Sequence, residues 1–233
     1  MMYSFEVKGV HKNYGRKQVF TDISFRFDQN RFIVLLGSNG SGKSTMLKLC
    51  AGLAPFSKGE IRLGDASSRI ERAQNASYVA EGVGYPAYQT AGTILTQQKK
   101  LYPEFNQEQA LHYCHEVSVP TQVKWGSLST GQRHLLALIV AISTQKPFLF
   151  IDELLANLDT TKKEAMQGIL TDFLLDDNRT IVMATHAYED VEMLADGAMF
   201  IKDDDVTTIT DLEGWRQEHG ASLRDLFARV GRA

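Results

Sequence analysis

The order of apolar and polar positions along the chain predicts two kinds of strand. Residues 3–10 and 23–27 alternate between apolar and polar side chains, a period of two that is typical of half-buried antiparallel strands. Residues 32–36, 148–151 and 180–184 are instead almost continuously apolar. Strands of that kind are buried on both faces of a sheet. The chain therefore combines an antiparallel region near its N-terminus with a buried sheet.

Helical patterns follow the buried strands. Residues 43–53 come soon after the first strand and have the spacing of a helix, and helical patterns also follow the other two strands. Repeated alternation of strand and helix favours a mostly parallel sheet flanked by helices. The predicted fold class is therefore α/β, with a mostly parallel core sheet and an N-terminal antiparallel β subdomain.

This alternation is interrupted between about residues 83 and 140. Helical segments are predicted near residues 91–102, 106–117 and 130–144, and no convincing strand separates them. We interpret the stretch as a helical lobe inserted into one domain, whose core comprises about residues 1–82 and 141–233. Near the C-terminus, Asp203, Asp204 and Asp205 are expected to form a solvated turn between two short strands.

Composition indicates the cellular compartment and the class of partner that the protein has. The 233 residues are 43% hydrophobic and carry a net charge of -3, so the overall charge does not favour a nucleic-acid partner. Cys50 and Cys114 do not make a disulfide framework, which indicates a reducing compartment. No signal peptide is recognised, and the longest apolar run, residues 135–142, is shorter than the roughly 20 residues of a membrane span. We expect a cytoplasmic protein, whose membrane partner, if it has one, is another chain.

A glycine-rich sequence follows the first buried strand. It fits the pattern G-x-x-x-x-G-K-[ST] and consists of Gly37, Ser38, Asn39, Gly40, Ser41, Gly42, Lys43, Ser44 and Thr45. Between a strand and a helix, this pattern cradles phosphates with backbone N–H groups. Lys43 is predicted to reach the β- and γ-phosphates of a nucleotide, and the Ser44 hydroxyl to bind Mg²⁺. A glycine-rich turn without a ligand is the alternative.

Two carboxylates follow the second buried strand, at the edge of the sheet where ligands of open α/β folds bind. Asp152 is expected to hold Mg²⁺ directly or through water. Glu153 points the other way and is predicted to orient or deprotonate the water that attacks the γ-phosphate. A strand that merely ends in a polar turn would look the same, but the phosphate loop nearby favours the functional interpretation.

A third pattern stands before a long apolar helix and consists of Leu128, Ser129, Thr130, Gly131 and Gln132. Ser129 suits the N-terminal cap of that helix, which would leave N–H groups free for an anion; a purely structural cap is the alternative. With these motifs in this order, the chain resembles the nucleotide-binding domain of ABC (ATP-binding cassette) ATPases over essentially its whole length. The resemblance implies a P-loop NTPase core.

The signature of that family is Leu-Ser-Gly-Gly-Gln, and Thr130 replaces its first glycine. The resemblance implies that Ser129 and Gly131, with Gln132 beside them, contact the nucleotide held by the opposite subunit. It also assigns Tyr14 to the aromatic that stacks on adenine and His186 to the switch histidine that contacts the γ-phosphate. Taken alone, either residue would more often be structural.

Other positions resemble the family less closely. The loop that crosses the dimer interface corresponds to Ala156, Asn157, Leu158 and Asp159, while Leu154 replaces the usual proline after the catalytic Glu. Glu81 stands where the family usually has Gln, after the strand that enters the lobe. Its carboxylate is a candidate Mg²⁺ ligand, and several exporter-type ATPases resemble this chain in having Glu there.

The resemblance implies ATP binding and hydrolysis, with ATP and Mg²⁺ as cofactors. The implied partners are a second cassette, as a homodimer or a paralogous heterodimer, and a transmembrane permease subunit of an exporter. The chain would then lie on the inner face of the cell membrane. The main alternative is a soluble ABC mechanochemical ATPase that acts on the ribosome or DNA, which the single phosphate loop disfavours. A kinase or GTPase is disfavoured by residues 128–132 and by the lack of a persuasive guanine-binding element.

Residues 81–105 are predicted to form the docking groove for the membrane subunit, because they begin at Glu81 and lead into the lobe. This stretch also contains aromatic residues, which are enriched at interfaces: Tyr85, Tyr88, Tyr102 and Phe105. The alternative is that these rings pack inside the lobe.

Overall fold

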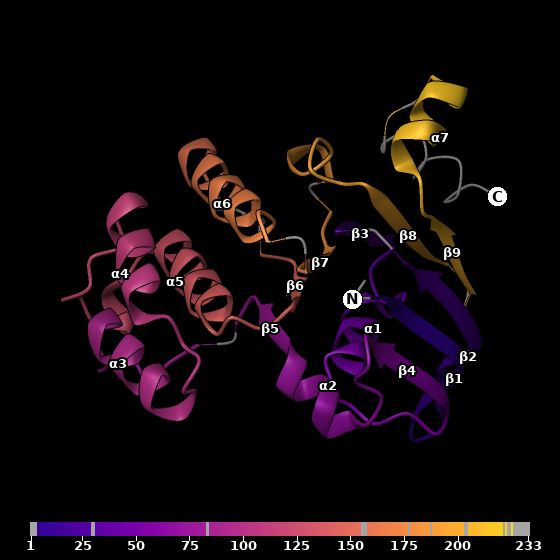
Figure 1. The fold of residues 1–233 in the computed structure, drawn as a ribbon, viewed down its shortest axis with the longest axis horizontal. Helices are drawn as coiled ribbons and strands as arrows, with labels where there is room; N and C mark the ends of the chain where they lie inside the picture. The colour runs from indigo at the N-terminus through magenta and orange to yellow at the C-terminus, as the bar shows by residue number, and fades with distance from the viewer. Residues whose placement is uncertain are drawn as a thin grey trace.

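Two sheets and a group of helices make up the protein in the computed structural model. It describes residues 4–28, 31–82, 84–154, 158–176, 178–186, 188–202, 205–220, 222 and 225. One sheet has three strands in the order β2-β1-β4, and the other has six in the order β5-β6-β7-β3-β8-β9. Figure 1 shows α3, α4 and α5 on one side of the larger sheet and the small sheet on the other.

The three-stranded sheet is antiparallel, as predicted from the alternating pattern. Its strands are β1 (Phe5–Tyr14), β2 (Lys17–Phe27) and β4 (Lys58–Leu63). On its apolar face, Phe5 lies edge-on to Phe25 and to Phe150 of the larger sheet. Tyr3, at the start of the predicted strand, lies outside the described residues. The ring contacts fix the small sheet against the larger one.

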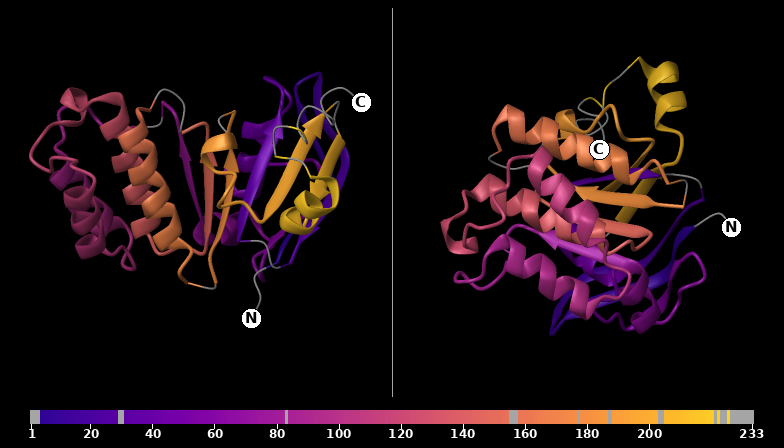
Figure 2. Two further views of the ribbon diagram at one scale, coloured as in Figure 1. Left: turned by 90° about the horizontal axis from the view of Figure 1, so that it is seen from above. Right: turned by 60° about the vertical axis from the view of Figure 1, so that its left-hand side comes forward.

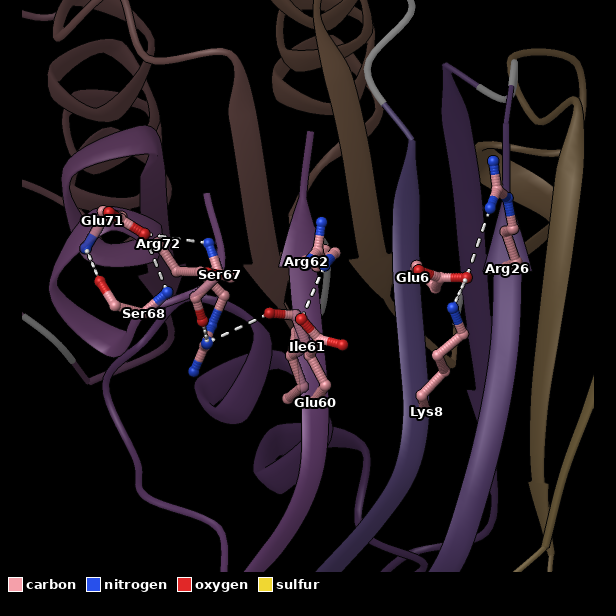
Figure 3. Close-up of polar contacts among 10 residues, drawn as sticks. All are labelled: Glu6, Lys8, Arg26, Glu60, Ile61, Arg62, Ser67, Ser68, Glu71 and Arg72. Carbon is pink, nitrogen blue, oxygen red and sulfur yellow. Dashed lines mark hydrogen bonds and ion pairs between the residues drawn. The ribbon is translucent and has the colours of Figure 1, made fainter. Parts of the chain in front are cut away.

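Charged side chains on the small sheet pair with one another (Figure 3). The Glu6 carboxylate lies 2.9 Å from Lys8 and 3.4 Å from Arg26. The hydrogen bond from Lys8 is the main cause that lowers the pKa of Glu6 below its usual value. Glu60 and Arg62 form a similar pair on β4 at 2.7 Å. These pairs satisfy the polar positions of the alternating strands.

A buried arginine joins helix α2 (Arg69–Asn75) to β4. Arg72 is 1% exposed and donates hydrogen bonds to the carbonyls of Ile61, at 3.2 Å, and Ser67. The helix begins with a capping box in which the Ser68 hydroxyl accepts from the Glu71 N–H and the Glu71 carboxylate accepts from the Ser68 N–H. Backbone carbonyls and the cap therefore hold α2 in place.

The six-stranded sheet is mostly parallel, which confirms the predicted fold class. Its strands are β5 (Ala76–Ala80), β6 (Phe148–Asp152), β7 (Thr180–Ala184), β3 (Phe32–Gly37), β8 (Gly197–Lys202) and the antiparallel β9 (Asp205–Ile209). Along β3, Val34 belongs to the apolar cluster beneath the helical lobe, whereas Ile33 and Leu35 belong to the cluster beneath the small sheet. The strand is therefore buried on both faces, as its continuous apolar run predicts.

Helix α1 (Lys43–Cys50) is shorter than predicted, since the expected helix ran to residue 53. Gly52 adopts a left-handed conformation with φ 72, which ends the helix. A Cβ atom on Gly52 would lie 2.4 Å from the carbonyl oxygen of Arg69. The close approach of α2 therefore requires glycine at this turn.

The three helices predicted between residues 91 and 144 are present, each within a residue or two of its expected bounds. They are α3 (Ala91–Leu101), α4 (Gln107–Glu116) and α5 (Thr130–Ser143). Helix α5 continues past residue 140 and contacts β5, where the Ser77 hydroxyl donates to the Ala141 carbonyl at 3.1 Å. Figure 2 shows these helices standing on one side of the larger sheet. Val83, at the expected start of the lobe, lies outside the described residues.

The remaining helices are α6 (Thr160–Phe173), α7 (Leu212–His219) and the short 3₁₀ turns η1 (Trp125–Ser127) and η2 (Tyr188–Asp190). Two short strands, β8 and β9, precede α7, as the sequence predicts. Asp203 and Asp204 lie outside the described residues, and Asp205 begins β9. None of the helices in the described ranges has both the length and the apolar character needed to cross a membrane.

Candidate functional site

A cavity of about 600 Å³ opens at the carboxyl end of β3. The hairpin between β1 and β2, the glycine-rich loop and the ends of β6 and β8 surround it. Its lining consists of Tyr14, Lys17, Gln18, Val19, Ser38, Asn39, Gly40, Ser41, Gly42, Lys43, Ser44, Thr45, Glu153 and Lys202. The cavity therefore brings the predicted phosphate loop together with Tyr14 and Glu153.

The glycine-rich loop needs glycine for two different reasons. Gly42 has φ 108, and a Cβ atom there would lie 2.7 Å from the Phe20 ring. A Cβ atom on Gly37 would lie 2.8 Å from the carbonyl oxygen of Ile201. Gly42 is also the N-cap of α1 and offers no side chain to cap it. The first N–H groups of α1 therefore remain available for an anion.

Lys43 lies at the bottom of this loop. It is 6% exposed, and its ammonium donates to the carbonyls of Gly37, at 2.9 Å, and Ser38, at 3.2 Å. Burial lowers the pKa of Lys43, while the nearby charges of Glu153 and Asp152 act in the opposite direction. The loop's own carbonyls thus orient a buried cation toward the place where phosphates would lie.

Glu153 and His186 meet Lys43 from neighbouring strands. The Glu153 carboxylate lies 3.9 Å from the Lys43 ammonium and 3.2 Å from Nε2 of His186. It also accepts a hydrogen bond from the His186 backbone N–H at 3.3 Å. These residues follow β6 and β7 and open α1 after β3, and the three strands are neighbours in the sheet. The structure therefore brings together all three residues predicted to be catalytic.

Glu153 has an unusual backbone conformation, with φ 55. The left-handed region is energetically unfavourable for a non-glycine residue, which adopts it only when its surroundings require it. The Glu153 N–H donates to the Ala184 carbonyl at 3.0 Å, which holds the backbone against β7. Glu153 lines the phosphate-loop cavity, whereas Asp152 is buried and is not among the lining residues.

Asp152 is buried at the end of β6, with 6% exposure. Its Oδ2 accepts a hydrogen bond from the Tyr78 hydroxyl at 2.8 Å, while Oδ1 is buried without a hydrogen-bond partner among the described residues. Burial, the hydrogen bond to Asp152 and its charge raise the pKa of Tyr78.

The oxygen atoms here fit Mg²⁺. The Ser44 hydroxyl lines the cavity, and Asp152, which is not among the lining residues, keeps one buried carboxylate oxygen without a partner. Both oxygens are hard ligands of the type that Mg²⁺ prefers. The described residues contain no group of three or more His, Cys, Asp or Glu side chains placed to hold a metal ion. Mg²⁺ at phosphate sites is held by one or two protein ligands plus phosphates and water.

Glu81, the third predicted Mg²⁺ ligand, does not line this cavity. Its backbone N–H lies 3.4 Å from the Asp152 carbonyl, but its exposed side chain lines a separate cavity of about 240 Å³. Thr130, Arg133 and His134 line the same cavity. In this structure Glu81 therefore belongs with the start of α5 rather than with the phosphate loop.

The signature residues lie at the N-terminus of α5 and do not line the phosphate-loop cavity. Ser129 and Gln132 form a capping box, in which each side chain accepts from the other's backbone N–H at 3.2 and 3.0 Å. The stem of Lys162 covers Gly131, because a Cβ atom there would lie 2.2 Å from Cδ of Lys162. Asp159 caps α6 by accepting from the Lys162 N–H. Ala156 and Asn157 lie outside the described residues.

Tyr14 is 50% exposed at the mouth of the cavity, so its ring is not part of the core. Sequence analysis did not identify Lys17, Gln18, Val19 and Lys202, which line the same cavity. Lys202 ends β8, the neighbour of β3, and carboxyl ends of adjacent parallel strands share one edge of a sheet. That rule could have identified Lys202 once the strand order was known.

Known proteins resemble this chain over most of its length. The family described as "ABC transporter" matches residues 20–156. The chain is 24% identical to the ABC transporter ATP-binding protein YtrB of Bacillus subtilis, over 92% of this chain and 74% of that protein. It is 28% identical to the aliphatic sulfonates import ATP-binding protein SsuB of Pectobacterium atrosepticum, over 95% of this chain and 83% of that protein.

Solved structures show the same fold. The ATP-binding subunit of an ABC transporter superposes with a TM-score of 0.83 at 20% identity and covers 99% of this chain and 100% of its own. A bacterial Atm1-family ABC exporter with ATP bound superposes with a TM-score of 0.80 at 16% identity, over 99% of this chain and 42% of its own. The likeness extends over nearly the whole chain.

Proposed function

Because this chain belongs to the ABC transporter family of ATP-binding domains and is an ATPase of that family, we propose that it is the cytoplasmic subunit that powers a membrane-spanning transport partner. The proposal that the chain hydrolyses ATP at this site rests on one observation: Lys43, Glu153 and His186 contact one another beside the phosphate loop. Lys43 and Glu153 supply a cation and a base that line the cavity, and His186 adds a hydrogen-bonding ring within 3.3 Å of both.

Each residue has a role in the proposed hydrolysis. The free N–H groups of α1 and the Lys43 ammonium bind the phosphates and stabilise the charge that develops on them. Glu153 accepts the proton of the attacking water, and His186 holds both the carboxylate and the γ-phosphate in position. Ser44 and Asp152 would hold Mg²⁺, which neutralises charge on the β- and γ-phosphates. Tyr14 stacks on the base at the mouth of the cavity.

The proposed active assembly contains two cassettes. Ser129 and Gly131 do not line the cavity of their own chain, so in this proposal the nucleotide that they contact is bound by a second cassette. A head-to-tail pair would place the N-terminus of α5 of one cassette against the phosphate loop of the other. Asp159, at the start of α6, lies next to that surface through its contact with Lys162.

The proposed docking site for the membrane partner is a groove of about 410 Å³ between the larger sheet and the lobe. Its lining is mainly apolar and includes Leu53, 56% exposed, and Tyr102, 40% exposed. Tyr85 lines it as well, edge-on to Trp125. Phe105 does not contribute, since it is completely buried in the lobe. For Phe105 the alternative, packing inside the lobe, is the one that holds, and Tyr88, although 72% exposed, does not line this groove.

An apolar segment of a membrane-spanning chain is the occupant that fits this groove. Among the described residues that line it, Lys146 alone carries a charge, and its ammonium already donates to the carbonyls of Ala73 and Ala76 at 2.8 and 3.1 Å. A mostly apolar groove that remains open on the surface of a subunit marks a binding site.

Export is the direction that we propose, on the ground that Glu81 replaces the usual Gln. Relatives named for import include those for aliphatic sulfonates, sulfate and phosphonates, while the exporter structure shares the fold. Transport measured in inside-out vesicles that contain this chain and its partner decides between the directions. Accumulation of substrate inside such vesicles indicates export, and its release indicates import.

The docking proposal is tested by placing a charge in the groove. Leu53→Asp and Tyr102→Asp are expected to abolish co-purification with the membrane partner while basal ATPase activity is retained. Leu175→Asp, which introduces the same charge at an exposed leucine outside the groove, serves as the control. Unchanged co-purification of both groove variants would contradict docking at this site.

A further inference from the structure

Lys12 and Tyr14 lie two residues apart near the end of β1, and their side chains are in contact. Their surroundings differ sharply, because Lys12 is 6% exposed whereas Tyr14 is 50% exposed at the mouth of the cavity. The Lys12 ammonium lies 4.2 Å from the centroid of the Tyr14 ring. That distance is typical of a cation held against the face of an aromatic ring.

The position of this ammonium is set by the loop that follows α1. Lys12 donates to the carbonyl of Pro55 at 2.8 Å. The loop is itself tied to β1, since both the N–H and the hydroxyl of Ser57 donate to the His11 carbonyl at 3.0 and 3.1 Å. Helix α1 begins at Lys43 in the phosphate loop. The Tyr14 ring is therefore placed relative to the phosphate loop through α1, Pro55 and Lys12.

No carboxylate of the described residues forms an ion pair with Lys12. A buried cation that is paired only with a carbonyl and a ring pays a desolvation cost that an ion pair would reduce. Stability of the small sheet alone therefore gives a weak reason for lysine here. A role in nucleotide binding explains the lysine better, because the ring that Lys12 contacts is the one proposed to bind the base.

We infer that Lys12 is a positioning residue for base binding: it occupies one face of the Tyr14 ring and so presents the other face to the nucleotide base. The inference rests on the proposed stacking role of Tyr14. Tyr14 stands at the tip of a hairpin, opposite Lys17 and next to Gly15. A side chain at such a tip is free to change rotamer unless something holds it. Fixing the ring before binding lowers the entropy lost when the base stacks on it.

The test compares a ligand that has a base with one that has none. Calorimetry of the purified full-length chain with Mg²⁺ measures the affinity for adenylyl imidodiphosphate, which is not hydrolysed, and for inorganic tripolyphosphate. Lys12→Met keeps the length of the side chain and removes its charge. We expect it to weaken binding of adenylyl imidodiphosphate about three- to tenfold and to leave binding of tripolyphosphate unchanged.

Two further variants separate positioning from a structural role. Lys12→Arg retains a cation that stacks on rings and is expected to restore the affinity. In a Tyr14→Ala background, Lys12→Met is expected to have no further effect on affinity for adenylyl imidodiphosphate. Lys8→Met removes a lysine from the same strand away from the cavity and provides the control.

The possible results are distinct. Equal weakening of both ligands by Lys12→Met, or no weakening of either, overturns the inference. If Tyr14→Ala weakens binding of adenylyl imidodiphosphate but Lys12→Met does not, stacking stands and the inference alone fails. If Tyr14→Ala itself has no effect, the stacking assignment fails and the inference fails with it.

Discussion

The N-termini of α1 and α5 are both proposed to face phosphates, yet the chain prepares them differently. At α1 the cap is Gly42, which has no side chain, so the first N–H groups remain unsatisfied by the protein. At α5 the capping box of Ser129 and Gln132 occupies N–H groups at the start of the helix. We call the N-terminus of α1 open, because no side chain caps it, and that of α5 closed, because its own side chains cap it.

The difference indicates that one chain alone assembles the site at α1, whereas the site at α5 needs a second chain. Around α1, Lys43, Glu153 and His186 already lie within hydrogen-bonding or ion-pair distance of one another. Around α5, the side chains of Ser129 and Gln132 each accept a hydrogen bond from the other residue's backbone N–H, and Lys162 covers Gly131. An anion arriving at α5 must compete with these contacts. Binding at α1 should therefore come first and be the stronger, and contacts at α5 should follow when two cassettes close.

The largest effect is expected at Glu153. Glu153→Gln keeps the shape of the side chain and removes the base, so kcat should fall by about 10²–10⁴-fold while ATP binding persists. A stable ATP-bound dimer, detected by size-exclusion chromatography, should then accumulate because the γ-phosphate is not released. Hydrolysis at the wild-type rate would show that Glu153 is not the base.

Removing the cation at the open terminus should have the next largest effect. Lys43→Ala deletes the ammonium that is oriented by the Gly37 and Ser38 carbonyls, and turnover should fall by about 10²–10³-fold. Affinity for ATP, measured by calorimetry, should fall with it. Ser129→Ala in parallel should leave ATP affinity of the single cassette unchanged. Equal losses in the two variants would remove the distinction between the open and closed termini.

A smaller effect is expected at the mouth of the cavity. Tyr14→Ala should weaken ATP binding by about 1–3 kcal/mol, the range measured for a base stacked on an aromatic ring. GTP should lose a similar amount, because every purine has a π-face. The affinities of both nucleotides can be measured by fluorescence titration. A loss confined to ATP would indicate hydrogen-bond recognition of adenine instead.

The smallest effect concerns the closed terminus and has a matched control. Ser129→Ala and Ser68→Ala each remove the cap of a helix that has a complete capping box. Each should lower the free energy of unfolding by about 1 kcal/mol in urea denaturation. Turnover should fall for Ser129→Ala alone, since Ser68 lines neither the phosphate-loop cavity nor the cavity at the start of α5. Equal turnover in the two variants would reduce Ser129 to a structural cap.

Local sequence patterns were sufficient to predict much of the fold and most of the residues that line the cavity at the end of β3. Residues 32–36 are apolar throughout because β3 is buried on both faces, and the glycines after it are required by the close approach of Phe20 and Ile201. Glu153 follows a buried strand and lines the cavity beside the phosphate loop.

Features that depend on distant contacts were not predicted. The end of α1 depends on the approach of Arg69 to Gly52, and the burial of Phe105 depends on how the lobe packs. Lys202 reaches the cavity only because β8 lies beside β3, an order that the sequence pattern does not reveal. Lys12 differs again, since it lies beyond the alternating residues 3–10 and no local pattern indicates its hydrogen bond to the Pro55 carbonyl.

The order of strands in the larger sheet has a consequence for how the protein is made. β3 is synthesised early, but its two hydrogen-bonding neighbours, β7 and β8, come from the last quarter of the chain. During translation, the strand that precedes the phosphate loop therefore has no neighbour in this sheet until β7 has been synthesised. Its apolar faces stay exposed for that time, which favours aggregation and binding by chaperones. The phosphate loop is likewise fixed in place late, because the strand before it gains its neighbours late.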